Sequence, residues 1–359
     1  AMGYGKPAEL MGIRDKLGEF WAMRGLMKFM TGKWPLSVQK YCERISDPVF
    51  KKFLMYLFLP QVPYWFILMV LGQLAGGYMA VLPDGSLNFS RAIESRFQEF
   101  GGNVIYNSHV DEIIVENDRA VGVKLVDGLK YQSDFVISSI DTYSVIYDLL
   151  QGHYTNEAID KRHKNWKVGG SLIMINLGVA REFTDEPWMQ MHILEEPIDV
   201  GGISSHEMVI RYFNYGNVFA PPGKSVVQVE FETGWDYWSN LRENDHEKYK
   251  KEKERVASSV IKQLENLYPD FTSQVEIVDV ATPHTIWRYT RNREGSYMGW
   301  APSGNLMTIR LRKTLPGLDN FYMAGQWSMG MGGVLPALMS GRQVVQLLCH
   351  HEGTKFMSI

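Results

Sequence analysis

The chain has 359 residues, of which 45% are hydrophobic and 21% are charged, so it can bury a core and, at roughly 150 residues each, form more than one domain. This composition places it in the globular class. The formal net charge of -3, with acidic and basic residues interleaved, argues against a nucleic-acid-binding surface.

Residues 1–75 are rich in Met, Leu, Phe and Trp and predict a run of helices. One predicted helical face is apolar and has basic residues near it. The apolar positions are Leu10, Ile13, Leu17, Phe20 and Trp21, and the basic positions are Arg14, Lys16, Arg24 and Lys28. Three interpretations stay open: a packed helical subdomain, a cap over an apolar cavity, and an amphipathic helix in contact with a membrane surface.

An apolar stretch runs from Phe53 to Leu71 and is interrupted by Pro60, Gln61 and Pro63. A membrane-spanning helix needs about 20 predominantly apolar residues, and each proline removes a backbone donor. We therefore expect two shorter helices here rather than one transmembrane span.

From Pro83 onward the pattern changes to one helix followed by strands. Ser86 is expected to cap the helix, and Gly101-Gly102 to end it. Four β-type runs follow, with turn signals at Asn117-Asp118 and Asp127-Gly128. The predicted strands are 104–106, 110–115, 120–125 and 135–138. This region therefore predicts a compact β-meander behind one helix.

Residues 169–283 predict a separate sheet with one long helix. The predicted strands are 171–177, 208–212, 225–232 and 275–280. An apolar stripe between Tyr249 and Leu267 marks the helix, which Pro269 ends. The charged run Glu247–Arg255 then lies on the solvated face of that helix.

Residues 319–341 predict a short apolar strand, a glycine-rich turn and the start of a helix near Val334. The glycines allow positive φ and let a flat ligand approach the backbone, while the helix start offers unpaired N–H groups and a positive dipole. These features suit a flavin. Turns of this kind also occur where elements merely pack closely, so that interpretation stays open.

Several of these segments, taken in order, resemble the phytoene desaturase-related FAD-dependent oxidoreductases of the carotenoid desaturase/isomerase and amine oxidase-like superfamily. The segments are 85–106, 110–115, 120–128, 134–139, 282–300 and 319–341. The resemblance extends from about Met11 to Gly341, and several spaced motifs in the right order are far more specific than one.

The resemblance implies FAD as cofactor, a flavin-binding domain joined to a substrate domain, and hydride removal, hydride addition or isomerisation on long apolar polyenes and related lipids. By position, Val110 matches the residue whose backbone meets the adenine end of FAD. The segment along the isoalloxazine ring and adjoining phosphates matches Gly325, Gly332, Gly333, Val334 and Leu335, and a turn beside the ring matches Gly295, Tyr297 and Gly299. Packing glycines and a buried strand valine would give the same residues.

One departure from the family matters more than any match. The family opens with a strand, G-x-G-x-x-G, a helix and a downstream acidic residue, which hold the FAD pyrophosphate and ribose. This sequence has no such motif, and its nearest candidate, Gly330-Met-Gly332, has Leu335 where the third glycine belongs. We expect a flavoprotein that lacks its N-terminal βαβ unit and, as this chain alone, binds FAD weakly or not at all and is inactive.

The expected fold is therefore mixed α/β: an FAD/NAD(P)-binding flavoprotein fold without that unit, interleaved with a substrate domain of antiparallel sheet and helices. Residues 1–82 are expected to form the helical part of the substrate domain, and 83–150 the retained helix and meander of the flavin domain. Residues 151–287 then form the substrate-domain sheet and long helix, and 288–359 the C-terminal segment of the flavin domain.

The leading functional hypothesis is an FAD-dependent oxidoreductase of desaturase, saturase or isomerase type, with a large apolar polyene or lipid-like molecule as substrate. No nucleophile elbow, H-E-x-x-H, Walker A or clustered Cys/His ligands occur, so no metal site is expected and no catalytic side chain is named. His284, Arg288 and Tyr297 are candidates for orienting a substrate; a structural role where the chain crosses between domains is the alternative.

Two other functions on the same scaffold stay open. One is a non-catalytic lipid-binding protein like the Rab GDP dissociation inhibitors, and the other is an amine or porphyrinogen oxidase. Cys42 and Cys349 match no metal or redox spacing and no signal peptide is visible, which indicates a cytoplasmic protein. Peripheral membrane contact is a further hypothesis, and the oligomeric state is left open.

Overall fold

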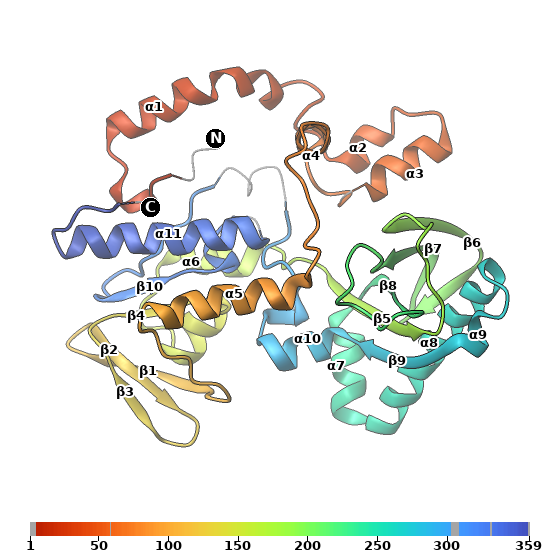
Figure 1. The fold of residues 1–359 in the computed structure, drawn as a ribbon. Coiled ribbons are helices and arrows are strands. Elements are labelled where there is room, and N and C mark those ends of the chain that lie inside the picture. Colours follow the sequence, from red (N-terminus) through yellow and green to blue (C-terminus); the bar gives the residue numbers. More distant parts are fainter. Residues whose placement is uncertain (1–4, 58, 303–308, 331, 358–359) are drawn as a thin grey trace. The chain divides into compact units, whose positions relative to one another are not determined.

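The computed structural model describes residues 5–57, 59–302, 309–330 and 332–357. The chain divides into two compact units that interleave along the sequence (Figure 1). Unit 1 comprises Ala1–Met79, Ser108–Gly169 and Met298–Ile359, and unit 2 comprises Ala80–Asn107 and Gly170–Tyr297. Which part binds a cofactor and which binds a substrate stays a prediction, as do the domain boundaries drawn from the sequence.

The N-terminal part of unit 1 is helical, as the sequence predicts. Its elements are η1 (Ala8–Leu10), α1 (Ile13–Met23), η2 (Arg24–Met30), α2 (Val38–Cys42), α3 (Pro48–Tyr56) and α4 (Tyr64–Ala75). The apolar stretch forms two helices rather than one, and Pro63 is the N-cap residue of α4. Among the described residues, no helix combines the length and the apolar character needed to cross a bilayer.

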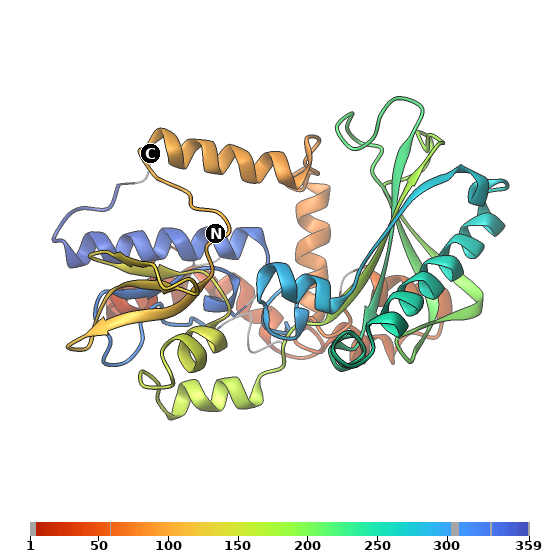
Figure 2. The same ribbon diagram turned by 90° about the horizontal axis from the view of Figure 1, so that it is seen from below.

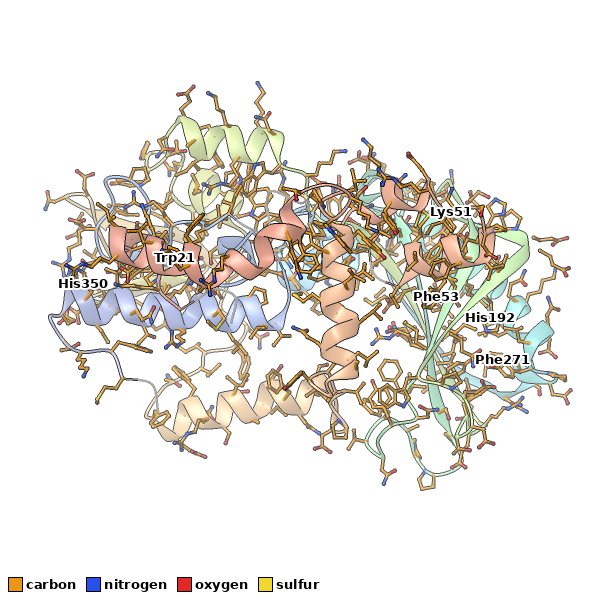
Figure 3. The ribbon with its side chains drawn as sticks, turned by 90° about the horizontal axis from the view of Figure 1, so that it is seen from above. Trp21, Lys51, Phe53, His192, Phe271 and His350 are labelled. Atoms are coloured by element: carbon orange, nitrogen blue, oxygen red, sulfur yellow. The ribbon has the colours of Figure 1, made fainter. Side chains whose placement is uncertain are left out.

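A small apolar core joins α2, α3 and α4. Its buried members are Val38, Cys42, Leu54, Val62, Phe66 and Ile67. Asp47 fixes the start of α3, because its carboxylate accepts a hydrogen bond of 2.7 Å from the N–H of Phe50. Lys51 and Phe53 lie on the same helix, where the Phe53 side chain stays exposed (Figure 3). These three helices therefore form a packed subdomain.

Helix α1 is attached to unit 1 through its polar face. Asp15 pairs with Lys6 at 2.9 Å, and Glu19 pairs with Arg310. The hydrogen bond from Lys6 lowers the pKa of Asp15. The apolar side chains face solvent, with Trp21 marked in Figure 3: Ile13 is 80% exposed, Leu17 54%, Phe20 55% and Trp21 62%. The helix is thus inverted relative to one that packs its apolar face on a core.

A three-stranded antiparallel meander follows in unit 1: β1 (Val110–Glu116), β2 (Arg119–Leu125) and β3 (Lys130–Gln132). Asn117 and Asp118 have φ of 51° and 60°, as a two-residue hairpin turn requires, so the predicted turn is confirmed. Strand β3 was not predicted; all of its residues are exposed, so it has no alternating apolar pattern.

Two short strands from distant parts of the sequence pair in parallel. They are β4 (Val136–Ser138) and β10 (Phe321–Met323), and β10 is buried throughout. The meander and this pair share one apolar core, and a parallel bridge between Arg119 and Asp319 links β2 to the residues before β10. The core members from these strands are Ile113, Ala120, Val136, Phe321 and Met323.

Four helical elements complete unit 1: η3, a π-helix (Ser144–Leu149), α6 (Glu157–Asn165), η6 (Gln326–Ser328) and α11 (Val334–His351). The start of α11 at Val334 confirms the predicted strand, turn and helix. His350 is exposed near the end of α11 (Figure 3), and His351 pairs with Glu352 at 3.0 Å, so the two histidines behave as surface residues.

Lys313 is buried in unit 1, with 1% of its surface exposed. Its ammonium donates to the carbonyl oxygens of Ser328 at 2.6 Å and Leu311 at 3.2 Å, and it lies 3.3 Å from the sulfur of Met329. Burial lowers the pKa of Lys313 to about 8. The lysine therefore joins the segment before β10 to the turn after it, at a cost in desolvation.

Unit 2 contains a five-stranded antiparallel sheet in the order β6-β7-β8-β5-β9. The strands are β5 (Ser171–Val179), β6 (Met189–Val200), β7 (Ile203–Tyr212), β8 (Ser225–Thr233) and β9 (Val275–Ala281). Its helical elements are α5 (Gly85–Glu99), α7 (Trp235–Asn244), α8 (His246–Leu267), α9 (Phe271–Gln274), α10 (Pro283–Thr290) and η4 (Arg293–Gly295). Side chains of β5 and β8 alternate between buried ones and half-buried or exposed ones, so the sheet has one core face.

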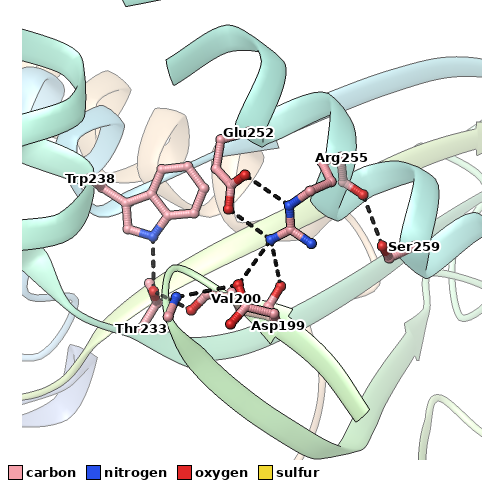
Figure 4. Close-up of polar contacts among 8 residues, drawn as sticks. Asp199, Val200, Thr233, Trp238, Glu252, Arg255 and Ser259 are labelled. Carbon is pink, nitrogen blue, oxygen red and sulfur yellow. Dashed lines mark hydrogen bonds and ion pairs between the residues drawn. The ribbon is translucent and has the colours of Figure 1, made fainter. Parts of the chain in front are cut away.

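Helix α8 covers the core face of the sheet (Figure 2). Its buried stripe runs from Tyr249 to Leu264, as the sequence predicts. Arg255 ties the helix to the strands by bonding Asp199, and Glu252 holds its guanidinium (Figure 4). Beside it, Trp238 of α7 donates to the Thr233 hydroxyl at 2.8 Å.

The structure differs from the sequence-based expectations at several elements. Residues 104–106 form no strand, because they follow a turn and find no partner strand. Helix α5 begins at Gly85 with Asp84 as its N-cap residue, so Ser86 lies inside the helix and does not cap it. Strand β6 and helices α7 and α10 were not predicted.

Replacing Leu264 of α8 by Ala should reduce the free energy of unfolding of unit 2 by about 2–5 kcal/mol, because its side chain is fully buried in the core between the helix and the sheet. Urea unfolding followed by near-UV circular dichroism measures the change. Lys262→Ala on the exposed face of the same helix is the control and should change little. Equal effects of the two substitutions would contradict the described packing of α8.

Stability should rise with pH because of Lys313. Its pKa falls from 10.5 to about 8 on folding, so the full penalty is present below pH 8 and disappears as pH approaches 10.5. Between pH 7 and 10 this gain is about 2–3 kcal/mol. We expect urea unfolding at both pH values to give this increase in the free energy of unfolding for the wild type and for Lys130→Met, but not for Lys313→Met. The same increase with pH in Lys313→Met as in the wild type would refute the assignment.

Candidate functional site

The carboxyl ends of β4 and β10 lie together, which is where ligands bind in parallel sheets with helical crossovers. The N–H of Ala324 donates to the carbonyl of Ser138 at 2.8 Å, so the pairing continues one residue past β10. Gly325 follows with φ of 79°, and a Cβ there would lie 2.6 Å from the carbonyl oxygen of Ser139. Two backbones cross here so closely that only glycine fits.

The turn after Gly325 is held by side chains that sequence reasoning missed. The Ser340 hydroxyl accepts from the N–H of Gly325 at 2.8 Å and donates to the Ala337 carbonyl at 2.6 Å. Trp300 donates to the Trp327 carbonyl at 3.1 Å, and Lys313 bonds the Ser328 carbonyl. The sequence pattern could have indicated Ser340, because it is a small polar residue on the buried stripe of α11 that also contains Pro336, Val344 and Leu347.

The other glycines of the predicted site fall into two groups. A Cβ at Gly332 would overlap the carbonyl of Met298, and one at Gly295 would overlap the carbonyl of Pro283, so packing explains both. A Cβ added at Gly333, with φ of 111°, or at Gly299, with φ of 78°, would not come close to any backbone atom that the structure describes. Both need glycine for their backbone conformation, and a Cβ at Gly333 would have only one atom of the described residues, in Pro336, within 4 Å.

The start of α11 has the features that a flavin ring needs. Gly333 is its N-cap residue and provides no capping side chain, so the first N–H groups of an 18-residue helix have no side-chain acceptor there. Val334 is 63% exposed and Leu335 67%. A flat, partly apolar ring with electron-rich oxygens fits an apolar surface beside such a helix start.

Val110 opens β1 and pairs with Leu125 at the end of β2. A parallel bridge between Arg119 and Asp319 links the start of β2 to the residues before β10. The strands that carry the two predicted FAD contacts, Val110 in β1 and Gly325 after β10, contribute to one apolar core. Both remain predictions as cofactor contacts.

The remaining predicted residues lie in unit 2. Burial, followed by the charges of Glu232 and Glu230, raises the pKa of Tyr297 to about 12, so its hydroxyl stays protonated near neutral pH. The His284 ring stacks on Trp235 at 6.2 Å, and burial lowers its pKa. Arg288 lies over the ring of Tyr289 at 5.5 Å. His284 and Arg288 thus each contact an aromatic ring within unit 2, and their role in orienting a substrate stays a prediction.

A chain of polar side chains crosses the second face of the unit 2 sheet. Arg211 bonds Gln228 at 3.2 Å and Glu230 at 3.0 Å, and Gln228 bonds Asn176 at 2.7 Å. Asn176 in turn reaches Asp279 at 3.3 Å. This face therefore combines apolar side chains with a hydrogen-bonded polar row across four strands.

Comparison with known proteins matches residues 30–349 to the flavin containing amine oxidoreductase family. Prolycopene isomerase from Arabidopsis thaliana is 24% identical over 70% of this chain and 42% of the isomerase. Phytoene desaturase (neurosporene-forming) from Rhodobacter capsulatus is 26% identical over 69% of this chain and 49% of the desaturase. The chain thus spans less than half the length of each.

A crystal structure shows the same fold. An oxidoreductase from Methanosarcina mazei superposes with a TM-score of 0.59 at 16% identity and covers 94% of this chain and 74% of that chain. The family match and the fold agree with the mixed α/β architecture and its antiparallel sheet. The chain belongs to the flavin containing amine oxidoreductase family, whose members use FAD, and is distantly homologous to carotenoid isomerases and desaturases.

Proposed function

We propose that this chain supplies the flavin-ring and substrate parts of an FAD-dependent oxidoreductase. The start of α11 carries the proposal, because an uncapped helix start and two exposed apolar residues, Val334 and Leu335, follow a glycine turn at the carboxyl ends of β4 and β10. Packing within the described residues explains the glycines at 325 and 332 but not this exposed apolar surface.

In this proposal the chain's own residues bind and orient the cofactor. Gly325, Gly332 and Gly333 provide a main-chain surface for the flat ring, and Val334 and Leu335 provide apolar contact and N–H donors. The backbone of Val110 contacts the adenine end. From the resemblance alone, Gly295, Tyr297 and Gly299 are assigned to a turn beside the ring. When bound, the flavin supplies the hydride chemistry.

The ADP half of FAD needs residues that this sequence does not contain. The 359 residues have no G-x-G-x-x-G motif, and the chain spans 42% of the isomerase it matches. We propose that a dinucleotide-binding unit outside these residues holds the pyrophosphate and ribose. The chain alone should then bind FAD weakly and be inactive.

The proposed substrate is a large apolar polyene or lipid-like molecule. Relatives named prolycopene isomerase and phytoene desaturase support this class, as do the 19 methionines of the sequence, whose thioethers repack around irregular apolar ligands. The reaction would be desaturation, saturation or isomerisation.

An amine or porphyrinogen oxidase is the second candidate, and one observation favours it. The polar row from Asp279 to Glu230 on the second face of the sheet offers hydrogen bonds that a pure hydrocarbon cannot return. A substrate with a charged or polar group would use them. The two candidates share the cofactor and differ in substrate.

FAD binding tests the proposal. We expect this chain alone to retain little FAD in ultrafiltration, and the protein extended by its upstream coding sequence to purify yellow with flavin absorbance. In the extended protein, Gly333→Val should reduce FAD binding by at least roughly tenfold, because a branched side chain is strained at φ of 111° and fills the space beside α11. Absorbance changes of added polyenes, and peroxide release from added amines, then separate the substrate classes.

Gly341→Ala is the matched control, because a Cβ there meets no atom within 4 Å. It should bind FAD like the wild type. An upstream sequence without G-x-G-x-x-G, or an extended protein that carries lipid and no flavin by mass spectrometry, would favour the lipid-binding alternative instead.

We also propose that α1 contacts membranes. Its carboxylates face unit 1 and its apolar side chains face solvent, with basic residues beside them, as in helices that lie at a bilayer surface. The exposure of these apolar side chains supports membrane contact beyond the sequence pattern, because a packed subdomain would bury Ile13 and Trp21.

Liposome flotation measures this contact. The wild type should float with vesicles containing anionic lipid, and the double substitution Leu17→Ser and Trp21→Ser should stay in the soluble fraction, since each lost side chain removes about 2 kcal/mol of apolar transfer. Val218→Ser, an exposed apolar residue of unit 2, is the control. Wild-type protein that remains soluble with both neutral and anionic vesicles would remove the idea.

A further inference from the structure

Unit 1 contains a cavity of about 350 Å³ that the flavin proposal does not use. It lies between α6, the π-helix and the segment that leads into β10. Its lining includes Thr142, Asn156, Arg162, Arg312, Thr314 and Met323. A volume of this size suits a small ligand.

Two arginines in the lining have no carboxylate partner among the described residues. Arg162 is partly buried and contacts the ring of Trp166 at 5.4 Å, and Arg312 is exposed; no ion pair joins either of them to an acidic side chain in the part of the chain that the structure describes. None of the residues outside the described ranges is an Asp or a Glu. Both guanidinium groups are therefore available for an anion.

The carboxylates near the cavity accept hydrogen bonds or ion pairs from groups other than the two arginines, and the second oxygen of Glu9 is buried without a hydrogen-bond partner among the described residues. Glu9 accepts from the backbone N–H groups of Lys313 and Thr314 and from the Thr314 hydroxyl. Asp160 accepts from the hydroxyls of Tyr147 and Thr155, and Glu157 pairs with Lys161. Asp141 accepts from the N–H of Tyr143. These contacts leave the two arginines as the charged groups that line the cavity.

Two further features set the charge around the cavity. The first turn of α6 borders the cavity through Asn156 and Ala158, and the helix dipole there is offset in part by the first-turn acids Glu157 and Asp160. Lys313 lies close by, since the charge of Arg162 contributes, after burial, to the lowered pKa of that lysine. Arg162 is thus near a second cation, Lys313, and the charged side chains of the lining itself are both cationic.

We propose that the cavity between α6 and the segment 312–317 is a phosphate-binding site, in which Arg162 and Arg312 hold the phosphate group of a free ion or of a small phosphate ester. The bidentate geometry of guanidinium groups matches phosphate oxygens. The site is separate from the proposed flavin contacts at Val334 and Leu335 and does not depend on FAD binding.

Calorimetric titration of this chain with inorganic phosphate, at constant ionic strength balanced with chloride, tests the site. We expect saturable binding by the wild type and at least roughly tenfold weaker binding by Arg162→Gln and Arg312→Gln, because charge-assisted hydrogen bonds are lost. Arg119→Gln removes the same charge elsewhere in unit 1 and should bind like the wild type. Because Arg312 is exposed, Arg312→Gln should fold, and its phosphate affinity tests the site if Arg162→Gln does not fold.

Absence of binding by the wild type, or equal binding by Arg312→Gln, would overturn the proposal. Loss of phosphate binding in Gly333→Val would place the anion at the flavin site and overturn it as well. Adenosine monophosphate and glycerol 3-phosphate distinguish the source: tighter binding than inorganic phosphate, abolished in Arg312→Gln, identifies an ester, and equal binding identifies the free ion.

Discussion

The crossing of two backbones behind β4 and β10 is the constraint on which the candidate site depends. A side chain at position 325 would lie 2.6 Å from the Ser139 carbonyl, so glycine is required for the C-terminal segment to leave the strand pair in its observed direction. Ser340 then fixes the turn to α11 through the N–H of Gly325. The proposed flavin contacts of Val334 and Leu335 depend on the direction in which the chain leaves Gly325, because that direction sets where α11 starts.

The strand, turn and helix at residues 319–341 were predictable because the apolar strand, the glycines and the helical stripe occur within one short segment. The physical reasons for the glycines were not predictable. The carbonyls that exclude a Cβ at positions 325, 332 and 295 belong to Ser139, Met298 and Pro283, and no local pattern identifies such partners. Strand β6 was missed because Glu195-Glu196-Pro197 interrupts it, at the register shift between Ile193 and Ile198.

Charge is arranged differently in the two units. In unit 2, polar side chains pair with one another across the sheet, from Asp279 to Glu230. In unit 1, Lys313 is buried against carbonyl groups, and Arg162 and Arg312 line a cavity without acidic partners among the described residues. Unpaired cations of this kind are costly to keep unless a ligand or a fixed turn makes use of them.

The inverted attachment of α1 has a consequence for ionic strength. The helix is linked to the rest of unit 1 by the ion pairs of Asp15 with Lys6 and of Glu19 with Arg310, in which every side chain is at least 28% exposed. Counterions screen such pairs within about 8–10 Å at physiological salt, whereas apolar burial strengthens as salt is added. Concentrated salt should therefore weaken the attachment of α1 while leaving the subdomain of α2, α3 and α4 intact.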